Sequence, residues 1–243
     1  MNSITLDTQT RSDFATHGFV SLPRLVDDDT LKEIRHAYDK LLEGEVDTSK
    51  ARDGHLGDLT RQIVGAEHCH PLFRDNAALK AGHAITKQLF GWEPVFVYSQ
   101  LLYKPAGHPH ETPWHQDAAY LKMPFTQAGA NIRPVSAQFW LALDDADESN
   151  GCMHFHPRVG ENKLLPHYVA AGASDDEARL LGVENPGSFI QDNLIIPCPI
   201  KAGCATVHGA DALHYTPANR STRPRRAYIF NFADRSYFRR AAK

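Results

Sequence analysis

The sequence predicts a mainly β protein, a sandwich or barrel buttressed by helices near its N-terminus. Two observations predict it. Amphipathic helical patterns lie mostly before residue 92, and β-rich runs separated by Pro, Gly, Asn and Asp follow them. Strands and helices do not alternate as they do around a parallel sheet, and the sequence contains no internal repeat. Helices first and strands after favour the sandwich or barrel.

The N-terminal third supplies the helices. Residues 14–24, "FATHGFVSLPR", predict a short strand closed by a proline. Residues 27–44, "DDDTLKEIRHAYDKLLEG", predict a helix, because Thr30 and Glu33 form a capping-box pattern and apolar residues recur at helical spacing up to Gly44. The polar stretch 45–62 predicts a loop, and residues 76–90 predict a second helix ended by Gly91.

The rest of the chain predicts strands and one short helix. The β-rich runs are "VFVYSQLLY" (95–103), "SAQFWLAL" (136–143), "CMHFH" (152–156), "CATVH" (204–208) and "RAYIFNF" (226–232). A later helix is predicted from Ser174, within a segment, 161–192, that we expect to act as a lid. The length suits one domain over 1–243, with a helical buttress at about 26–92 and a β core at about 93–233.

Composition excludes several classes of protein. A net charge of −3 gives no electrostatic basis for binding nucleic acid or an anionic membrane. No apolar run approaches the roughly 20 residues that span a bilayer, and the N-terminus lacks the pattern of a secretory signal, so we expect a cytoplasmic protein. Four scattered cysteines form no C-x-x-C pair, which argues against a zinc knuckle or a disulfide framework.

The stretch "TPWHQDAAYL" (112–121) places a histidine and an aspartate at the spacing of metal ligands. In a strand, His115 and Asp117 share a face, and a neutral imidazole with a carboxylate is a good donor pair for a divalent metal. The pair could equally be a surface turn, so a third ligand is needed. His208 and His214 are the candidates in the C-terminal segment.

His214 is the favoured third ligand. A turn and a returning strand after it would bring an arginine alongside, whereas His208 fits a packed or surface histidine. Two histidines and one carboxylate leave three positions open on an octahedral metal, as in non-haem Fe(II) oxygenases. An arginine nearby suits the far carboxylate of a 2-oxo acid.

These segments resemble the phytanoyl-CoA dioxygenase family of Fe(II)/2-oxoglutarate enzymes, which share a double-stranded β-helix (jelly-roll, cupin-like) core. The family's H-x-D is matched by "WHQD". Its distal histidine, followed two residues later by Ser or Thr and eleven residues later by arginine, is matched by "HYTPANRSTRPR" (214–225). "FWLALDDADESNGC" and "HGFVSLPRLVDDDTLKEIRHAY" resemble further parts of the family, so the resemblance runs from about residue 14 to 233.

The resemblance implies roles for seven residues. His115, Asp117 and His214 would bind Fe(II), and Arg225 with Thr216 would hold the distal carboxylate of 2-oxoglutarate. Two further positions, Gln100 and Trp140, match residues that line the co-substrate pocket. For Gln100 and Trp140, strand packing is an equal alternative, Thr216 suits a turn, and the arginines around Arg225 suit a solvated face.

The reaction implied by the resemblance is oxidation of a C–H bond in a small-molecule metabolite, using dioxygen and releasing succinate and CO₂. Hydroxylation, desaturation, epoxidation and rearrangement all belong to it. Related halogenases carry a small residue at the carboxylate position, so Asp117 favours oxygenation over chlorination. The alternative is a non-redox jelly-roll protein, a metal-binding protein or an isomerase, which would have no need of the arginine.

The residues that follow Asn150-Gly151 depart from the family's pattern. The usual Pro-Gly-Ser-His turn is replaced by "PRVG" (157–160), in which Arg158 fits a surface salt bridge or a contact with an anionic substrate group. His154 and His156 lie on the strand before this turn, where inward side chains would face substrate.

Overall fold

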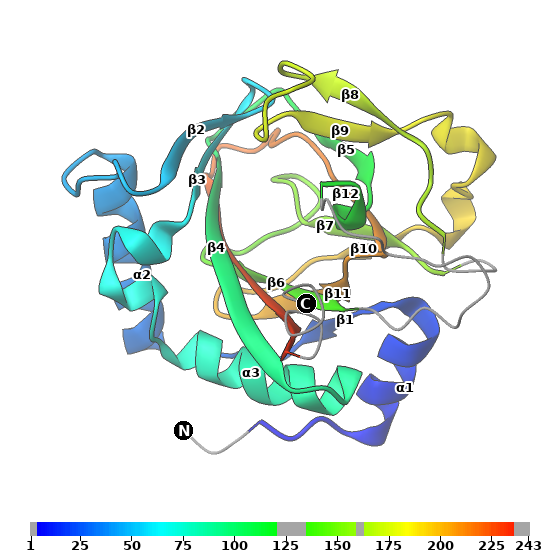
Figure 1. Ribbon diagram of the computed structural model, residues 1–243, viewed down its shortest axis with the longest axis horizontal. Helices are drawn as coiled ribbons and strands as arrows, with labels where there is room; N and C mark the ends of the chain where they lie inside the picture. The colour runs from blue at the N-terminus through cyan, green and yellow to red at the C-terminus, as the bar shows by residue number, and fades with distance from the viewer. Residues whose placement is uncertain (1–3, 121–134, 159–162, 236–243) are drawn as a thin grey trace, which may run out of the picture.

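The computed structural model describes residues 4–120, 135–158 and 163–235, and two facing antiparallel sheets dominate it (Figure 1). The major sheet has the strand order β1-β11-β6-β13-β4-β3-β2 and the minor sheet the order β10-β7-β12-β5. The major-sheet strands are β1 (Phe19–Leu22), β2 (Arg52–Leu56), β3 (Thr60–Val64), β4 (Pro94–Lys104), β6 (Ser136–Ala142), β11 (Ala205–Gly209) and β13 (Arg225–Asp234). The minor-sheet strands are β5 (Thr112–His115), β7 (Met153–His156), β10 (Ile196–Cys198) and β12 (Leu213–Thr216). The predicted jelly-roll architecture is confirmed.

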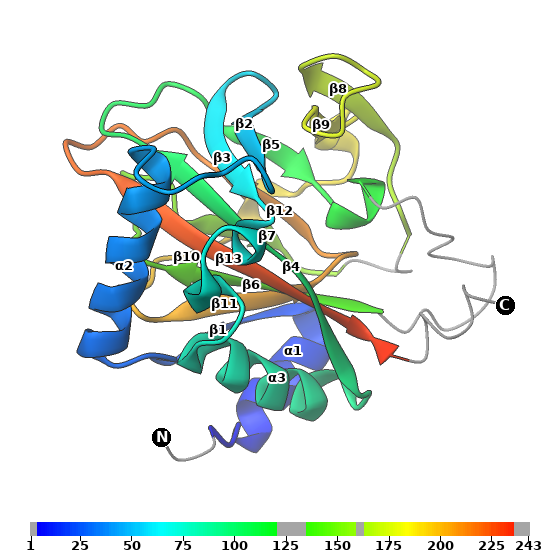
Figure 2. The ribbon, with the colours of Figure 1, turned by 60° about the vertical axis from the view of Figure 1, so that its left-hand side comes forward.

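Three helices and a separate hairpin complete the described structure. The helices are α1 (Thr8–His17), α2 (Asp28–Leu42) and α3 (Ala77–Phe90), and the hairpin pairs β8 (His167–Ala171) with β9 (Leu180–Val183). Five 3-10 turns link the elements: η1 (Ala66–His68), η2 (Pro71–Phe73), η3 (Asp117–Tyr120), η4 (Pro186–Ser188) and η5 (Asp192–Leu194). Figure 2 shows α2 and α3 outside the major sheet, away from the β8–β9 hairpin.

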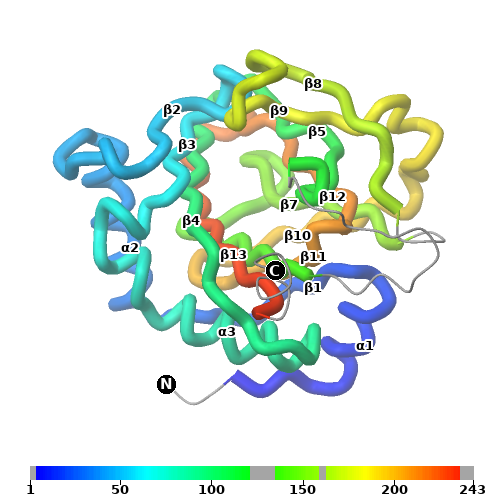
Figure 3. Tube along the Cα trace, in the orientation of Figure 1, coloured from blue at the N-terminus to red at the C-terminus, as the bar shows by residue number. Residues whose placement is uncertain are grey.

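The alternation of side chains along the central strands creates two cores. In β13, Tyr228 and Phe230 point outward into the cluster formed with α2 and α3, while Ala227 and Ile229 point inward between the sheets. The outer cluster packs the helices against the major sheet. The inner face of this sheet lines the space between the two sheets. Figure 3 shows β1 beside β11, a pairing that places the N-terminal strand at one edge of the major sheet, while β13 lies in its middle.

Both predicted helices are present, but the cap of α2 differs from the prediction. The side chain of Asp27 accepts a hydrogen bond from the backbone N–H of Thr30 at 2.8 Å, so Asp27 is the N-cap and the Thr30–Glu33 capping box is wrong. Helix α3 begins after Asn76 and ends at Gly91, whose φ of 68° is left-handed, as predicted.

Three local predictions are wrong. The strand expected over 14–24 is confined to β1, because α1 continues to His17. The loop expected over 45–62 contains the β2–β3 hairpin, whose edge strand β2 is mostly exposed and therefore carries no apolar pattern. The helix expected from Ser174 is absent from the described residues, since its apolar end "LLGV" is buried as strand β9.

No helix among the described residues is both long and apolar enough to span a bilayer.

Candidate metal centre and its pocket

Three candidate ligands lie within reach of one ion. His115 ends β5 and faces His214 of β12 in direct register, and Asp117 follows in η3. One donor atom from each residue lies within 4.8 Å of the others. Nε2 of each histidine is 3.7 Å from Oδ1 of Asp117. The prediction that His115 and Asp117 share the face of one strand is wrong, because β5 ends at His115; the 3-10 turn that follows directs the Asp117 carboxylate to the same point instead.

Backbone carbonyls orient both imidazoles. Nδ1 of His115 lies 2.7 Å from the carbonyl oxygen of Pro113, and Nδ1 of His214 lies 2.9 Å from that of Ala212. A proton on Nδ1 satisfies each carbonyl and leaves the Nε2 lone pair pointing toward Asp117. This is the tautomer that a metal requires of a histidine ligand.

The surroundings of the three side chains favour the protonation states in which they can bind a metal. Burial lowers the pKa of both His115 and His214, so both imidazoles are neutral at neutral pH. Burial opposes ionisation of Asp117, but His214 and a hydrogen bond from His208 outweigh it and hold the pKa of Asp117 below its usual range. Two nitrogens and one carboxylate oxygen fit a divalent transition metal such as Fe(II).

A second cluster of buried groups adjoins the triad along β12. Thr216, two residues after His214, accepts a hydrogen bond from Nζ of Lys104 at 3.0 Å, and Lys104 pairs in register with Arg225. Both cations are fully buried, and the Arg225 guanidinium lies 5.2 Å from the ring centroid of Trp140. The neighbouring Arg226 points to the opposite face, as expected.

The guanidinium of Arg225 has no hydrogen-bond partner among the residues that the structure describes, and no described carboxylate forms a salt bridge with it. Burial lowers the pKa of Arg225 to about 10, and burial together with Arg225 holds the pKa of Lys104 well below its usual range. A buried cation without a partner is energetically costly, so this cluster fits an anionic ligand. Sequence reasoning missed Lys104, the last residue of β4.

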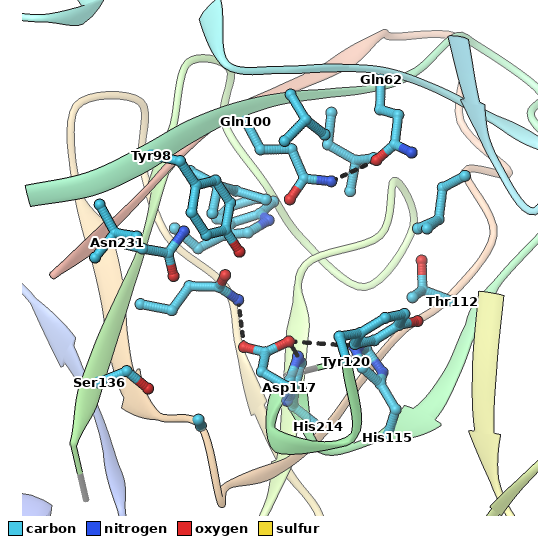
Figure 4. A pocket seen from close by; sticks show the side chains of 18 of the residues that line it. Gln62, Tyr98, Gln100, Thr112, His115, Asp117, Tyr120, Ser136, His214 and Asn231 are labelled. Carbon is cyan, nitrogen blue, oxygen red and sulfur yellow. Dashed lines mark hydrogen bonds and ion pairs between the residues drawn. The ribbon is translucent and has the colours of Figure 1, made fainter. Parts of the chain in front are cut away.

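A pocket of about 520 Å³ lies over the triad, between the two sheets. Figure 4 shows His115, Asp117 and His214 on one side of it, with Tyr98, Gln100 and Asn231 opposite. Nε2 of Gln100 donates to Oε1 of Gln62 at 2.6 Å. Of the remaining three predicted site residues, Thr216 and Trp140 line the pocket, and Arg225 lies behind it against the ring of Trp140. All seven predicted site residues therefore lie in or beside one cavity.

Other residues singled out from the sequence lie elsewhere. His154 packs near Tyr215 and Glu148, and Nε2 of His156 accepts the backbone N–H of Gln191, so neither faces the pocket. Arg158 forms the expected salt bridge, at 2.9 Å from Asp211. Residues 159–162, which include the rest of the variant turn and the start of the proposed lid, lie outside the described residues. Beyond them, the loop between β8 and β9 contributes Glu177 and Arg179 to the pocket.

His208, expected from the sequence to be a packed or surface histidine, is packed, and it also contacts the triad. It is fully buried, and its Nε2 lies 3.2 Å from Oδ2 of Asp117. The same carboxylate oxygen accepts a hydrogen bond from Nε2 of Gln138 at 2.7 Å. The triad carboxylate is thus held from behind by two side chains.

Comparison with known proteins finds one family. The family model described as phytanoyl-CoA dioxygenase (PhyH) matches residues 14–227. Phytanoyl-CoA dioxygenase domain-containing protein 1 of Danio rerio is 29% identical over 175 residues, which cover 71% of this chain and 57% of that protein. The chain therefore spans little more than half the length of the curated relatives it matches.

Solved structures agree on the architecture. EvdO2 from Micromonospora carbonacea var. aurantiaca, complexed with 2-oxoglutarate, is 26% identical with a TM-score of 0.77, over 96% of this chain and 92% of that one. SnoK, a non-heme alpha ketoglutarate dependent carbocyclase from nogalamycin biosynthesis, is 21% identical with a TM-score of 0.71, over 96% and 87%. At that identity the second likeness concerns the fold.

Proposed function

The chain belongs to the phytanoyl-CoA dioxygenase (PhyH) family, and from this premise we propose that it is an Fe(II)- and 2-oxoglutarate-dependent oxygenase acting on a small-molecule metabolite. The observation that carries the proposal is the pairing of two buried sites. A two-histidine, one-carboxylate set converges on one point, and the adjoining cluster holds a buried guanidinium that has no partner in the described part of the chain. Residues 1–243 would form one catalytic domain.

His115, Asp117 and His214 would hold the iron. When bound, iron with 2-oxoglutarate and dioxygen supplies the oxidising power for a C–H bond, with succinate and CO₂ as by-products. The backbone carbonyls behind the two imidazoles keep them in the ligating tautomer, and the interior position of the triad excludes bulk water. The 26% identity to EvdO2, a protein solved with 2-oxoglutarate, supports the same co-substrate here.

Arg225, Lys104 and Thr216 would bind the distal carboxylate of 2-oxoglutarate. The guanidinium offers its two-pronged donor edge, and the ammonium and hydroxyl add single hydrogen bonds. An anion there offsets the cost of burying two neighbouring cations. Trp140 and Gln100 would form the walls of the same compartment, where Trp140 also supports the guanidinium through its ring face.

The remaining space and the triad favour oxygenation of a metabolite. A volume of about 520 Å³ matches a small ligand together with the co-substrate. Asn231 lines the pocket with a buried Nδ2 that lacks a partner among the described residues, which suits an oxygen acceptor on the substrate. A carboxylate at Asp117 occupies the position that chlorination would leave open. Hydroxylation, desaturation, epoxidation or rearrangement is therefore the proposed outcome.

A non-redox metal protein or isomerase is the alternative. The buried Arg225–Lys104 cluster argues against it, because metal binding alone does not need two buried cations.

The test is spectroscopic and anaerobic. Fe(II) added with 2-oxoglutarate is expected to give a weak visible charge-transfer band in the wild-type protein. Arg225→Ala should raise the 2-oxoglutarate concentration for half-maximal band at least about tenfold, since hydrogen bonds to charged groups contribute about 1.5–3 kcal/mol. Arg223→Ala, at an exposed arginine on the preceding loop, is the matched control and should behave as wild type.

Absence of the band in the wild type would overturn the oxygenase proposal, and a band whose 2-oxoglutarate dependence is unchanged in Arg225→Ala would overturn the role of Arg225. If the band forms, screening a metabolite panel for substrate-stimulated release of succinate identifies the substrate class.

A further inference from the structure

His208 lies at the end of a polar row that crosses the inner face of the major sheet. Register pairing places His208 of β11 opposite Gln138 of β6, Gln138 opposite Asn231 of β13, and Asn231 opposite Tyr98 of β4. The last three residues line the pocket. His208 is the member behind the pocket wall, where it meets the carboxylate of Asp117.

Three polar atoms form a triangle at this point. Oδ2 of Asp117 is 2.7 Å from Nε2 of Gln138 and 3.2 Å from Nε2 of His208, and the two nitrogens are 3.2 Å apart. At most two of the three contacts can be hydrogen bonds, because Nε2 of a neutral imidazole either donates or accepts.

The surroundings decide which contact is the hydrogen bond. If Nε2 of His208 accepted from Gln138, its lone pair would face the Asp117 carboxylate, and the proton would sit on Nδ1. That Nδ1 is buried and has no partner among the described residues, so an unpaired donor would be buried there. With the proton on Nε2, His208 donates to Asp117, the repulsion between lone pair and carboxylate is removed, and Nδ1 becomes a bare acceptor in place of a buried, unpaired N–H. Gln138 and His208 then donate together to one oxygen.

His208 also contacts a second member of the triad. Its ring centroid is 4.5 Å from that of His214 at a tilt of 50°, and 5.2 Å from that of Phe155. The imidazole is therefore fixed in place by packing, and it in turn limits rotation of His214.

We propose that His208 is a positioning residue of the metal centre, which donates from Nε2 to Oδ2 of Asp117 so that only Oδ1 faces the metal. The proposal rests on the proposed iron site. A carboxylate restrained in this way presents one oxygen alone, which keeps three positions open for the co-substrate and dioxygen. A freely rotating carboxylate could bind the metal through both oxygens, and the second oxygen would then occupy one of the three open positions.

The test compares metal affinity across variants that separate the hydrogen bond from the packing. His208→Phe keeps an aromatic ring and removes the donor, whereas His208→Gln keeps an N–H at a comparable reach. Dissociation constants for Mn(II) and for Fe(II), measured anaerobically by calorimetry, should rise about 10- to 100-fold in His208→Phe. His208→Gln should recover most of the loss.

His156→Phe is the matched control. It removes another buried histidine that makes a hydrogen bond, but outside the triad, so its metal affinity should stay near wild type whatever its thermal stability. If His208→Phe does not fold, His208→Asn replaces it, since its shorter side chain also cannot reach Asp117. In either case, metal affinity equal to wild type overturns the proposal.

The two proposals fail differently. If the wild type binds Mn(II) but forms no charge-transfer band with Fe(II) and 2-oxoglutarate, the oxygenase function fails while the role of His208 remains measurable. If the wild type forms the band and His208→Phe binds metal with unchanged affinity, only the positioning role is overturned.

Discussion

At the scale of single residues, Lys104, at the end of a strand, is a candidate site residue that the sequence pattern does not identify. It pairs with Arg225 in the adjacent strand, and both side chains are fully buried. Like charges side by side in a protein interior repel each other and lose hydration, so such a pair is retained where an anion compensates it. This places Lys104 with Arg225 in the proposed co-substrate clamp.

Lys104→Met should therefore weaken binding of 2-oxoglutarate without a matching loss of stability. The dissociation constant for 2-oxoglutarate, from titration of the charge-transfer band, should rise about tenfold or more because a charged hydrogen bond is lost. The temperature of thermal unfolding should change little, because removal of a buried cation offsets the loss of its hydrogen bonds to Thr216 and to the carbonyl of Pro217. Lys80→Met, at an exposed lysine of α3, should change neither. A lower melting temperature with unchanged 2-oxoglutarate binding would assign Lys104 a structural role instead.

Residue chemistry explains which candidates the sequence could identify. His115, Asp117 and His214 were chosen by donor type and by the offset to Arg225, and the structure brings all of them into one cavity region. Lys104 was missed because a lysine before Pro105 resembles the polar end of a strand. His208 could not be linked to Asp117, since that contact depends on the register of β11 with β6.

At the scale of elements, helix starts and edge strands mark the boundary of what sequence patterns reveal. Three acidic residues precede Thr30, and any of them could cap α2; the structure selects Asp27. The β2–β3 hairpin was missed because β2 is a polar edge strand, and β9 because its four buried residues follow a helix-like acidic stretch. By contrast, strongly periodic segments such as α3 and β13 were predicted to within two residues at each end.

The cap of α2 gives a test at this scale. Asp27→Ala should lower the free energy of unfolding by about 1 kcal/mol, because the first turn of the helix loses its side-chain acceptor. Thr30→Ala should cost less than Asp27→Ala, since it retains the backbone N–H that Asp27 accepts and loses only the hydroxyl contact. Urea unfolding of both variants distinguishes the caps, and an equal loss in Thr30→Ala would favour the capping box that the sequence suggested.

At the scale of the whole molecule, pairing between distant strands assembles the candidate site. His115 and His214 are 99 positions apart in the sequence, yet they are direct partners in the β5–β12 ladder. The sequence indicated that such a set should exist through its resemblance to a family. The order of strands and their register, which depend on long-range pairing, could not be obtained from local patterns.

Buried histidines also make the stability of the molecule depend on pH. His108 is buried with Nε2 3.0 Å from Oγ1 of Thr60, and burial, followed by Lys104, lowers the pKa of His108 to about 4. The unfolded chain, with a histidine pKa of about 6.5, binds a proton that the folded chain does not bind between these values. The contribution of His108 to the free energy of unfolding should therefore be at its full value above about pH 6.5 and should be lost as the pH drops toward about 4.

His108→Gln isolates this contribution. Urea unfolding across the same pH window should show a slope smaller by up to one proton than that of the wild type. At neutral and mildly alkaline pH the two curves should run parallel. Identical slopes over the acidic window would mean that His108 titrates alike in the folded and unfolded chains.

The position of β5 has a consequence for local opening of the structure. This strand is last in the hydrogen-bonded order of the minor sheet, and its final residue is one of the three candidate ligands. An ion bound by His115, Asp117 and His214 would cross-link the β5–β12 ladder. It would join the edge strand β5 and the turn after it to β12. Local opening of β5 would then require dissociation of the ion, so bound metal would lower the population of the open state. Amide protons of β5 would exchange with solvent at a rate set by the free metal concentration.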